Sequence, residues 1–177
     1  KIKVEDFIDK DDTKISWTRG LRNRVVKTQS IAADSEVVTS LYRPFCKQLL
    51  YFSNELIESM GLALKLFPGG KEGNCLKNIG IILSGIGGAK PFSCLITENP
   101  TCMDIVEKGQ IFPLYWYEES KTRQLSLFDE NPKSEYIRHE GISNWILNEV
   151  RTRLKLKSID KEMIFYYIYG FLHSPEY

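Results

Sequence analysis

The sequence predicts a single α+β (mixed α/β) domain, with a small central β-sheet flanked by helices and a helical pair at its C-terminal end. Three short apolar runs in the middle of the chain are typical of buried strands, at 79–83, 92–96 and 111–117. The final third instead places apolar residues at helical spacing. At 177 residues, of which 42% are hydrophobic and 27% charged, the chain can bury one core without metals or disulfides.

Composition divides the domain into four stretches: a polar N-terminal segment (1–41), a strand-rich core (42–117), a long loop (118–141) and the C-terminal helices (142–177). Within the first stretch, residues 15–18 suit a short strand with Trp17 turned inward. The third stretch is polar and contains Pro132, so we expect a surface excursion there.

The core is expected to begin with a break at Tyr42-Arg43-Pro44-Phe45, because a proline disfavours helical backbone at the residue before it. A buried strand at 48–52 and a helix at 55–65 should follow. Apolar residues spaced four apart predict that helix: Leu56, Met60 and Leu64.

The C-terminal end of the chain is expected to be helical, although the aromatic residues at 165–169 would also suit a strand. A first helix follows from apolar residues at 3.6-residue spacing: Ile142, Trp145, Ile146, Val150 and Leu154. Asp160 is expected to cap a second helix that runs to Phe171 and is followed by Pro175.

Further upstream we expect a short helix at 101–107, and Pro113 suits a strand at the edge of a sheet.

The charge distribution gives no global signal for nucleic acid. The formal net charge is +1, from 24 basic and 23 acidic side chains, whereas a domain that depends on phosphate contacts is usually strongly basic. Locally, residues 14–47 hold seven basic side chains against two acidic ones, a net charge of +5. Because such clusters are most often solvated faces, this one is weak support for a binding site by itself.

No motif in the chain predicts catalysis. Residues 85–90, Gly-Ile-Gly-Gly-Ala-Lys, lack the spacing of a phosphate-binding loop and the third glycine of a dinucleotide fingerprint, and Pro91 follows at once. A tight turn between two strands is expected there instead. No G-x-S-x-G elbow occurs, and Asn99-Pro100-Thr101-Cys102 lacks the second proline and the aromatic residue of an adenine-methyltransferase signature. We therefore expect no catalytic residue in this chain.

Metal-binding and membrane-spanning patterns are not found in the sequence either. Four cysteines and two histidines are scattered without a C-x-x-C pair, so we expect reduced thiols and no metal site. No apolar run approaches membrane-spanning length, and a cytoplasmic location is expected. Because the chain starts at Lys1 rather than Met, we expect it to be a piece of a longer polypeptide.

Four segments, in this order, resemble a single protein family: Trp17-Thr-Arg19, Tyr42-Arg-Pro-Phe45 with Leu50-Tyr51, Phe112–Glu118, and Phe165–Tyr177. Together they are similar to the C-terminal specificity region of type ISP restriction-modification enzymes and related adenine-specific DNA methyltransferase–helicase proteins. The resemblance runs from about residue 15 to the end of the chain. Its most specific parts are the Tyr-Arg-Pro-Phe block and the final thirteen residues.

The resemblance implies a bacterial polypeptide that joins a nuclease, an ATP-dependent translocase, an N6-adenine methyltransferase and a target-recognition domain, of which this chain matches only the last. Double-stranded DNA is then the implied partner, together with the methyltransferase and helicase domains of the same polypeptide. S-adenosylmethionine, ATP and Mg²⁺ would serve the parent enzyme, and no cofactor is expected in this chain.

Recognition of a duplex requires cationic and amide side chains, because bases are read through bidentate hydrogen bonds and phosphates are held by Lys and Arg. The DNA-binding candidates are Arg19, Arg22, Arg24, Lys27, Arg43, Lys47 and Lys90. For Arg43 the favoured interpretation is that it holds its own turn through local carbonyls. Four aromatic residues are expected in the core rather than stacked on bases: Trp17, Phe45, Tyr115 and Tyr169.

An alternative function stays open, in which the chain is a protein-interaction module that couples the methyltransferase to the motor. Gln124-Leu125-Ser126-Leu127-Phe128 resembles the short peptide with which bacterial proteins dock on the DNA sliding clamp. Five residues carry little information, and packing of this segment on its own domain is the favoured interpretation.

Overall fold

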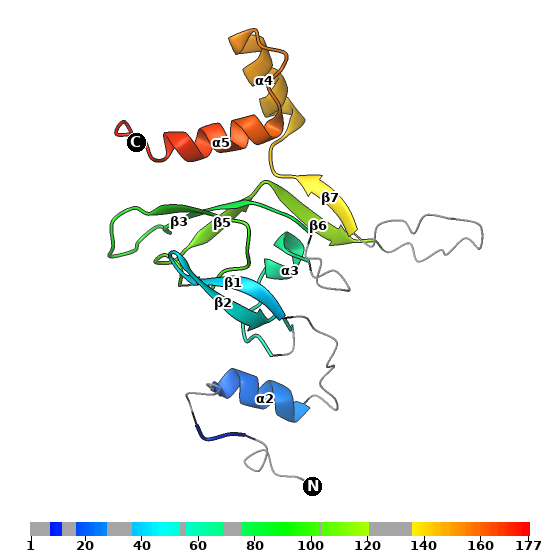
Figure 1. The fold of residues 1–177 in the computed structure, drawn as a ribbon, viewed down its shortest axis with the longest axis vertical. Coiled ribbons are helices and arrows are strands. Elements are labelled where there is room, and N and C mark those ends of the chain that lie inside the picture. Colours follow the sequence, from blue (N-terminus) through cyan, green and yellow to red (C-terminus); the bar gives the residue numbers. More distant parts are fainter. Residues whose placement is uncertain are drawn as a thin grey trace, which may run out of the picture.

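The computed structural model describes residues 8–11, 17–27, 37–53, 56–68, 76–102, 104–120 and 136–177. Within these ranges the elements are α2 (Arg19–Lys27), β1 (Val37–Arg43), β2 (Cys46–Tyr51), α3 (Ala63–Leu66), β3 (Gly80–Leu83), β4 (Cys94–Thr97), β5 (Gln110–Pro113), β6 (Tyr115–Glu119), β7 (Tyr136–Glu140), α4 (Asn144–Leu154) and α5 (Lys161–Phe171). The strands occupy the middle of the molecule, with α2 at one end and α4 and α5 at the other (Figure 1). The predicted α+β class and the C-terminal helical pair are confirmed.

The strands form three small antiparallel sheets rather than the one central sheet that the sequence predicts. β1 pairs with β2, β3 lies between β4 and β5, and β6 pairs with β7. The apolar run at 111–117 is divided between β5 and β6 because the backbone changes sheet at Leu114. The Leu114 N–H donates to the Ile79 carbonyl and its own carbonyl accepts from the Gly141 N–H, both at 2.7 Å. Pro113 lies on β5, an edge strand, as predicted.

Asn78 joins three parts of the chain from a position that is 3% exposed. Its Nδ2 donates to the carbonyls of Leu66 in α3 (2.7 Å) and Tyr115 in β6 (2.6 Å). Its Oδ1 accepts the backbone N–H groups of Ile79 (2.9 Å) and Tyr115 (3.0 Å). The two donors and two lone pairs of the amide are therefore all used, which makes its burial favourable and fixes how α3 and β6 meet the start of β3.

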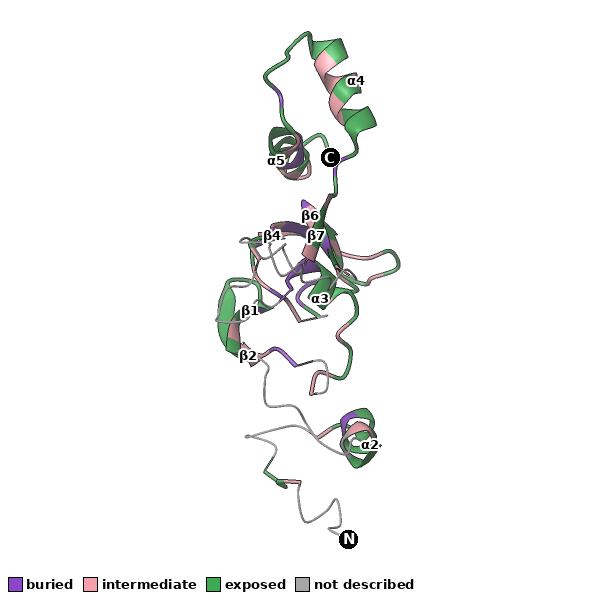
Figure 2. Cartoon of the chain, turned by 90° about the vertical axis from the view of Figure 1, so that its right-hand side faces the viewer, coloured by how far each residue is buried: buried purple, intermediate pink, exposed green. Residues whose placement is uncertain are grey.

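Three apolar clusters make up the core. The first joins β1, β3 and the turns at 104–108, and consists of Leu41, Ile82, Ile105 and Val106. The second packs α5 against β3 and β4 through Phe165, which is buried. The third holds α4 to α5 and consists of Ile142, Ile159 and Ile164. Buried residues accordingly gather around the sheets, whereas most of α2 and α4 is exposed (Figure 2).

Four predictions about the core and the long loop are wrong. The strand expected to be buried at 48–52 is β2, which is exposed from Cys46 to Leu49 and only half-buried at Leu50 and Tyr51. The helix at 55–65 is reduced to the single turn of α3 because Gly61 adopts a left-handed φ of 55°, which interrupts helical backbone. In place of the expected helix at 101–107, Thr101 forms an isolated β-bridge with Leu41, and residues 104–107 form turns and bends. The ends of the expected loop at 118–141 pair as β6 and β7, with Glu118 opposite Ile137. Residues 121–135 lie outside the described part of the chain.

The predictions for the N-terminal segment are wrong, whereas those for the C-terminal helices are confirmed. α2 and β1 lie in the polar stretch 1–41, where only a short strand at 15–18 was expected. Trp17 and Thr18 belong to no strand, and residues 15–16 lie outside the described ranges. The Asp160 cap is confirmed, since its Oδ1 accepts the Met163 N–H at 2.7 Å. Local signals at helix termini were therefore more informative than the composition of the first stretch.

We predict that Asn78→Asp lowers the free energy of unfolding at pH 7 by about 3 kcal/mol, because a carboxylate has no N–H for two buried carbonyls. Urea denaturation measures the change. Part of the loss should be recovered at acid pH, where the protonated carboxyl donates one hydrogen bond. Asn148→Asp, at an exposed position of α4, is the control and should change stability by less than about 0.5 kcal/mol. Equal stability of the Asn78→Asp protein and the wild type would contradict the role given to Asn78.

Candidate nucleic-acid interface

The described part of the chain holds an open groove of about 1490 Å³, called here the edge groove. Its walls come from the β1–β2 turn, the segment 90–95, the turns at 104–108 and the end of the chain at 172–177. The β1–β2 turn, the β3–β4 connection and the C-terminus all lie on one side of the molecule (Figure 1, left). The groove carries three long cations, Arg43, Lys90 and Lys108, beside two carboxylates, Asp104 and Glu107.

The β1–β2 turn is a two-residue connection, Pro44-Phe45, between the paired residues Arg43 and Cys46. Proline suits the first central position of a type II turn, and the second requires positive φ, which Phe45 adopts at 64°. A register shift between Leu41 and Arg43 accompanies the turn. The hairpin thereby places Arg43 at the groove and Lys47, exposed on β2, beside Phe45 at a neighbouring hollow.

Arg43 holds the turn, as the favoured interpretation of the sequence predicts. Its Nη1 donates to the Tyr42 carbonyl at 3.2 Å, and the guanidinium lies 4.3 Å from the centre of the Tyr42 ring. The same nitrogen lies 3.4 Å from the Cys102 Sγ. Arg43 is exposed and lines the groove, and a guanidinium has five N–H donors, so donors remain for a ligand there.

The glycine-containing segment at 85–90 is a tight turn, as expected, and residues 107 and 108 hold it in place. The Glu107 carboxylate accepts the backbone N–H groups of Ala89 (2.8 Å) and Lys90 (2.7 Å). The Lys108 Nζ donates to the Gly87 carbonyl at 2.7 Å. These two amides are therefore unavailable to a phosphate, and Lys90 can offer only its side chain, which makes no hydrogen bond or ion pair with the described residues.

The pKa of the Glu107 carboxyl lies below its ordinary value. The hydrogen bonds from the Ala89 and Lys90 backbone are the main cause, and the nearby Lys90 and Lys108 ammonium groups add to it. Glu107 is consequently ionised at neutral pH and committed to the turn. No sequence signal linked Glu107 and Lys108 to this site, because their partners lie more than a dozen positions earlier.

α2 carries the second group of basic residues and lies apart from the β1–β2 turn and the C-terminus (Figure 1). Arg24 is structural, since its guanidinium donates to the carbonyls of Ile57 (2.7 Å) and Glu58 (2.9 Å). The other three candidates on α2 are exposed: Arg19, Arg22 and Lys27. The structure thus divides the seven predicted residues, bringing Arg43, Lys47 and Lys90 to one side and leaving α2 elsewhere.

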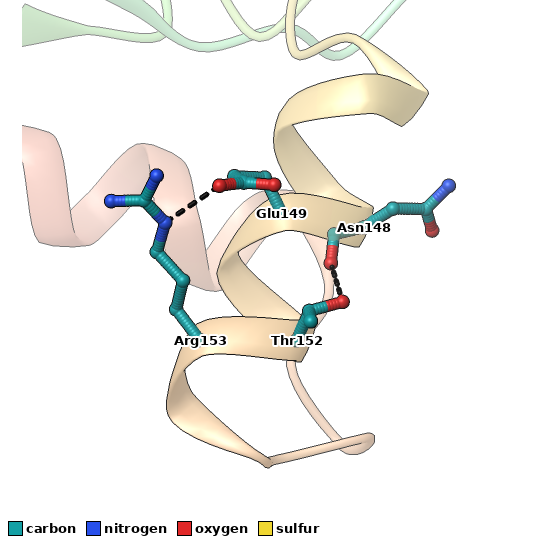
Figure 3. Close-up of polar contacts among 4 residues, drawn as sticks. All are labelled: Asn148, Glu149, Thr152 and Arg153. Carbon is teal, nitrogen blue, oxygen red and sulfur yellow. Dashed lines mark hydrogen bonds and ion pairs between the residues drawn. The ribbon is translucent and has the colours of Figure 1, made fainter.

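Cations on α4 are engaged with the helix and its flank. Arg153 Nε bonds the Glu149 carboxylate at 2.6 Å, one turn earlier, and the Thr152 hydroxyl donates to the Asn148 carbonyl (Figure 3). Arg151 Nε donates to the Ile159 carbonyl at 2.7 Å. An exposed i,i+4 pair contributes only about 0.3–0.5 kcal/mol, so the Glu149–Arg153 contact tethers Arg153 loosely.

One aromatic prediction is wrong. Phe45 is 92% exposed at the tip of the hairpin instead of lying in the core. The turn explains the difference, because a residue at the second central position of a two-residue connection points away from both strands. Trp17, Tyr115 and Tyr169 are half-buried.

Two further observations concern the described residues. No helix there is long and apolar enough to cross a membrane. No group of three His, Cys, Asp or Glu side chains gathers there as metal ligands. The segment 124–128, which resembles a clamp-docking peptide, lies outside the described ranges.

Three solved structures share the fold. The ATP-dependent Type ISP restriction-modification enzyme LlaBIII, bound to DNA, is 30% identical over 92% of this chain, with a TM-score of 0.66. A DrdV–DNA complex is 32% identical over 89% of the chain, with a TM-score of 0.69. A nuclease-deletion mutant of the Type ISP restriction-modification enzyme LlaGI, in complex with a DNA substrate mimic, is 27% identical over 98%, with a TM-score of 0.62. The chain therefore has the fold of a domain found in restriction-modification enzymes.

The family model of the Type ISP C-terminal specificity domain matches residues 1–177, and the chain belongs to this family. The resemblance read from the four sequence segments is thereby confirmed. The chain spans 10%, 14% and 11% of the LlaBIII, DrdV and LlaGI chains. No curated protein matches it.

We predict that the amide protons of Ala89 and Lys90 titrate together in NMR spectra, with a midpoint below 4.5, the ordinary pKa of a glutamate. The hydrogen bonds favour the charged carboxylate, so the turn is held above this midpoint and loosened as pH falls through it. Glu107→Gln should abolish the transition. A midpoint at or above 4.5 would show that Glu107 does not hold the turn.

Proposed function

We propose that this chain recognises a short sequence in duplex DNA on behalf of a larger restriction-modification polypeptide. Membership of the Type ISP C-terminal specificity family carries the proposal. The three solved relatives, each described as a complex with DNA or a DNA mimic, support it. The edge groove supplies a surface suited to this role, because exposed Arg43 and Lys90 side chains lie at an open hollow large enough to receive part of a duplex backbone.

Phosphate contacts should hold the chain on the duplex, and hydrogen bonds to base edges should supply discrimination. Lys90 and Lys47 are proposed as phosphate ligands, because a lysine is a flexible point charge. Arg43 is better suited to a base edge, since its position is fixed by Tyr42 while further N–H donors stay exposed. Arg24 is not proposed as a DNA ligand, because its guanidinium donates hydrogen bonds to two backbone carbonyls.

The remaining activities belong to the proposed parent polypeptide. We propose that an adjoining methyltransferase domain modifies an adenine in the recognised sequence with S-adenosylmethionine, and that a helicase domain uses ATP and Mg²⁺. The similarity to an enzyme described as ATP-dependent supports the second part. No residue of this chain is proposed to bind any of these cofactors.

Replacing Lys47 and Lys90 by Ala is predicted to weaken binding of the 177-residue chain to a fluorescent duplex of mixed sequence. Each lost phosphate contact should reduce the slope of log affinity against log salt by about 0.9. Fluorescence anisotropy across a salt series measures both quantities. Lys157→Ala, on the connection between α4 and α5, is the matched control and should leave them unchanged. Flat titrations of the wild-type chain at low salt would overturn the proposed function.

Reversing two charges on α2, Arg19→Glu with Arg22→Glu, tests whether the second basic group touches DNA. Both side chains are exposed, so the temperature of unfolding should not change. The affinity for DNA should fall, and the slope of log affinity against log salt should decrease by the amount expected for two phosphate contacts. Unchanged anisotropy titrations would exclude α2 from the interface and leave the edge groove as the binding surface.

A further inference from the structure

Phe45 is an apolar side chain held out in solvent at the tip of the β1–β2 hairpin. It is 92% exposed, so it contributes almost nothing to the core. Its backbone is also in the left-handed region, with φ of 64°, where a residue with a side chain is disfavoured by about 1–2 kcal/mol and glycine is not. A Phe in this position costs folding free energy and adds little packing energy to the core. We therefore infer that its contacts lie outside the chain.

The hairpin tip is rigidly held. The Leu41 N–H donates to the Pro100 carbonyl at 2.8 Å, and the Cys102 N–H donates to the Leu41 carbonyl at 3.3 Å. The Cys102 thiol donates to the Tyr42 carbonyl at 2.8 Å. Because Pro44 also restricts the turn, the backbone that carries Phe45 is constrained, and little backbone entropy is lost when the hairpin meets a binding partner.

The charges around Phe45 favour a polyanion as that partner. Arg43 and Lys47, both exposed, flank it on the two strands, and Lys90 lies at the groove that Arg43 lines. An apolar side chain between cations matches the chemistry of a DNA wedge, in which the apolar group enters between base pairs while the cations hold the adjacent phosphates. Glu98 also lines the hollow beside Phe45, but the two residues that flank Phe45 on the hairpin are both cationic, and a protein partner would have to neutralise them.

We propose that Phe45 is a wedge that inserts among the bases of duplex DNA and partly unstacks one base step. The proposal rests on the proposed function and deepens it, because it names the side chain that contacts bases through stacking rather than through hydrogen bonds. Unstacking costs a few kcal/mol in a paired duplex and less at a mismatch, where stacking is already weakened. A wedge therefore binds a mismatched duplex more tightly than a paired one.

The test compares two fluorescent duplexes that differ only by one central mismatch, titrated with the 177-residue chain. The wild type should prefer the mismatched duplex. Phe45→Gly should bind the paired duplex about tenfold more weakly and show no preference, because stacking on an aromatic side chain contributes about 1–3 kcal/mol per base. Urea denaturation should show equal or higher stability, since glycine relieves the strained φ.

Matched variants separate a wedge from other roles. Phe45→Trp retains a stacking surface and should keep the preference for the mismatch. Lys90→Ala should weaken binding to both duplexes equally, because it removes a phosphate contact alone. Trp145→Ala removes an aromatic residue that is 73% exposed on α4, at the far end of the molecule, and should change neither affinity.

The outcomes distinguish the two proposals. Binding of both duplexes by Phe45→Gly with wild-type affinity would overturn the wedge, leave the proposed function standing and point to a protein partner for the hairpin tip. A clear loss of stability in Phe45→Gly would also overturn it, by giving Phe45 a structural role. Failure of the wild type to bind either duplex at low salt would overturn the proposed function itself.

Discussion

The buried amide of Asn78 is the interaction on which the arrangement of the sheets depends. One side chain satisfies carbonyls from α3 and β6 and two backbone N–H groups at the start of β3 and β6. The two-stranded β6–β7 sheet would be only marginally stable alone, so its fixed connection to the start of β3 matters. Since β3 leads directly from this crossing to the turn at 85–90, the amide also sets where Lys90 lies.

A second constraint connects the walls of the edge groove. Leu41 of the β1–β2 hairpin, Ile82 of β3, and the pair Ile105 and Val106 share one apolar cluster. The hairpin turn, the glycine turn and the turns at 104–108 therefore rest on the same few side chains. Because packed interiors transmit small changes in volume, a cavity made in this cluster would move all three walls together. The packing of the core beneath the groove therefore determines the shape of the groove.

The parts of this fold that could be predicted from sequence are those decided locally. Asp160 marks the start of α5 because a cap acts within one turn, and the apolar runs of β3 and β4 identify strands that are covered on both sides. The pairing of β6 with β7 depends on contacts across residues 120–135 and left no local pattern. Similarly, spacing alone could not reveal that Gly61 turns left-handed inside an otherwise helical pattern.

The candidate site shows the same division. The cluster of charge at 14–47 was visible in the sequence, but folding sends α2 and the β1–β2 hairpin to different places and gives Arg24 a structural role. Lys90 joins Arg43 from a segment more than forty positions later, through a groove that only the tertiary fold creates. Phe45 was expected in the core because its side chain is hydrophobic. Pro44 before it instead defines a turn that leaves the Phe45 side chain exposed to solvent.

The balanced charge of the chain fits the recognition of a sequence better than tight binding of any duplex. What matters for a site-specific protein is the ratio of specific to non-specific affinity, and phosphate contacts raise both equally. A net charge of +1, with Asp104 and Glu107 inside the groove, limits the non-specific part. Arg24 and Arg151 donate to backbone carbonyls within the fold and Arg153 pairs with Glu149, so these three side chains contribute less to non-specific phosphate binding. In the proposed complex, discrimination then depends on groups that contact the bases themselves, namely the guanidinium of Arg43 and the aromatic ring of Phe45 beside it.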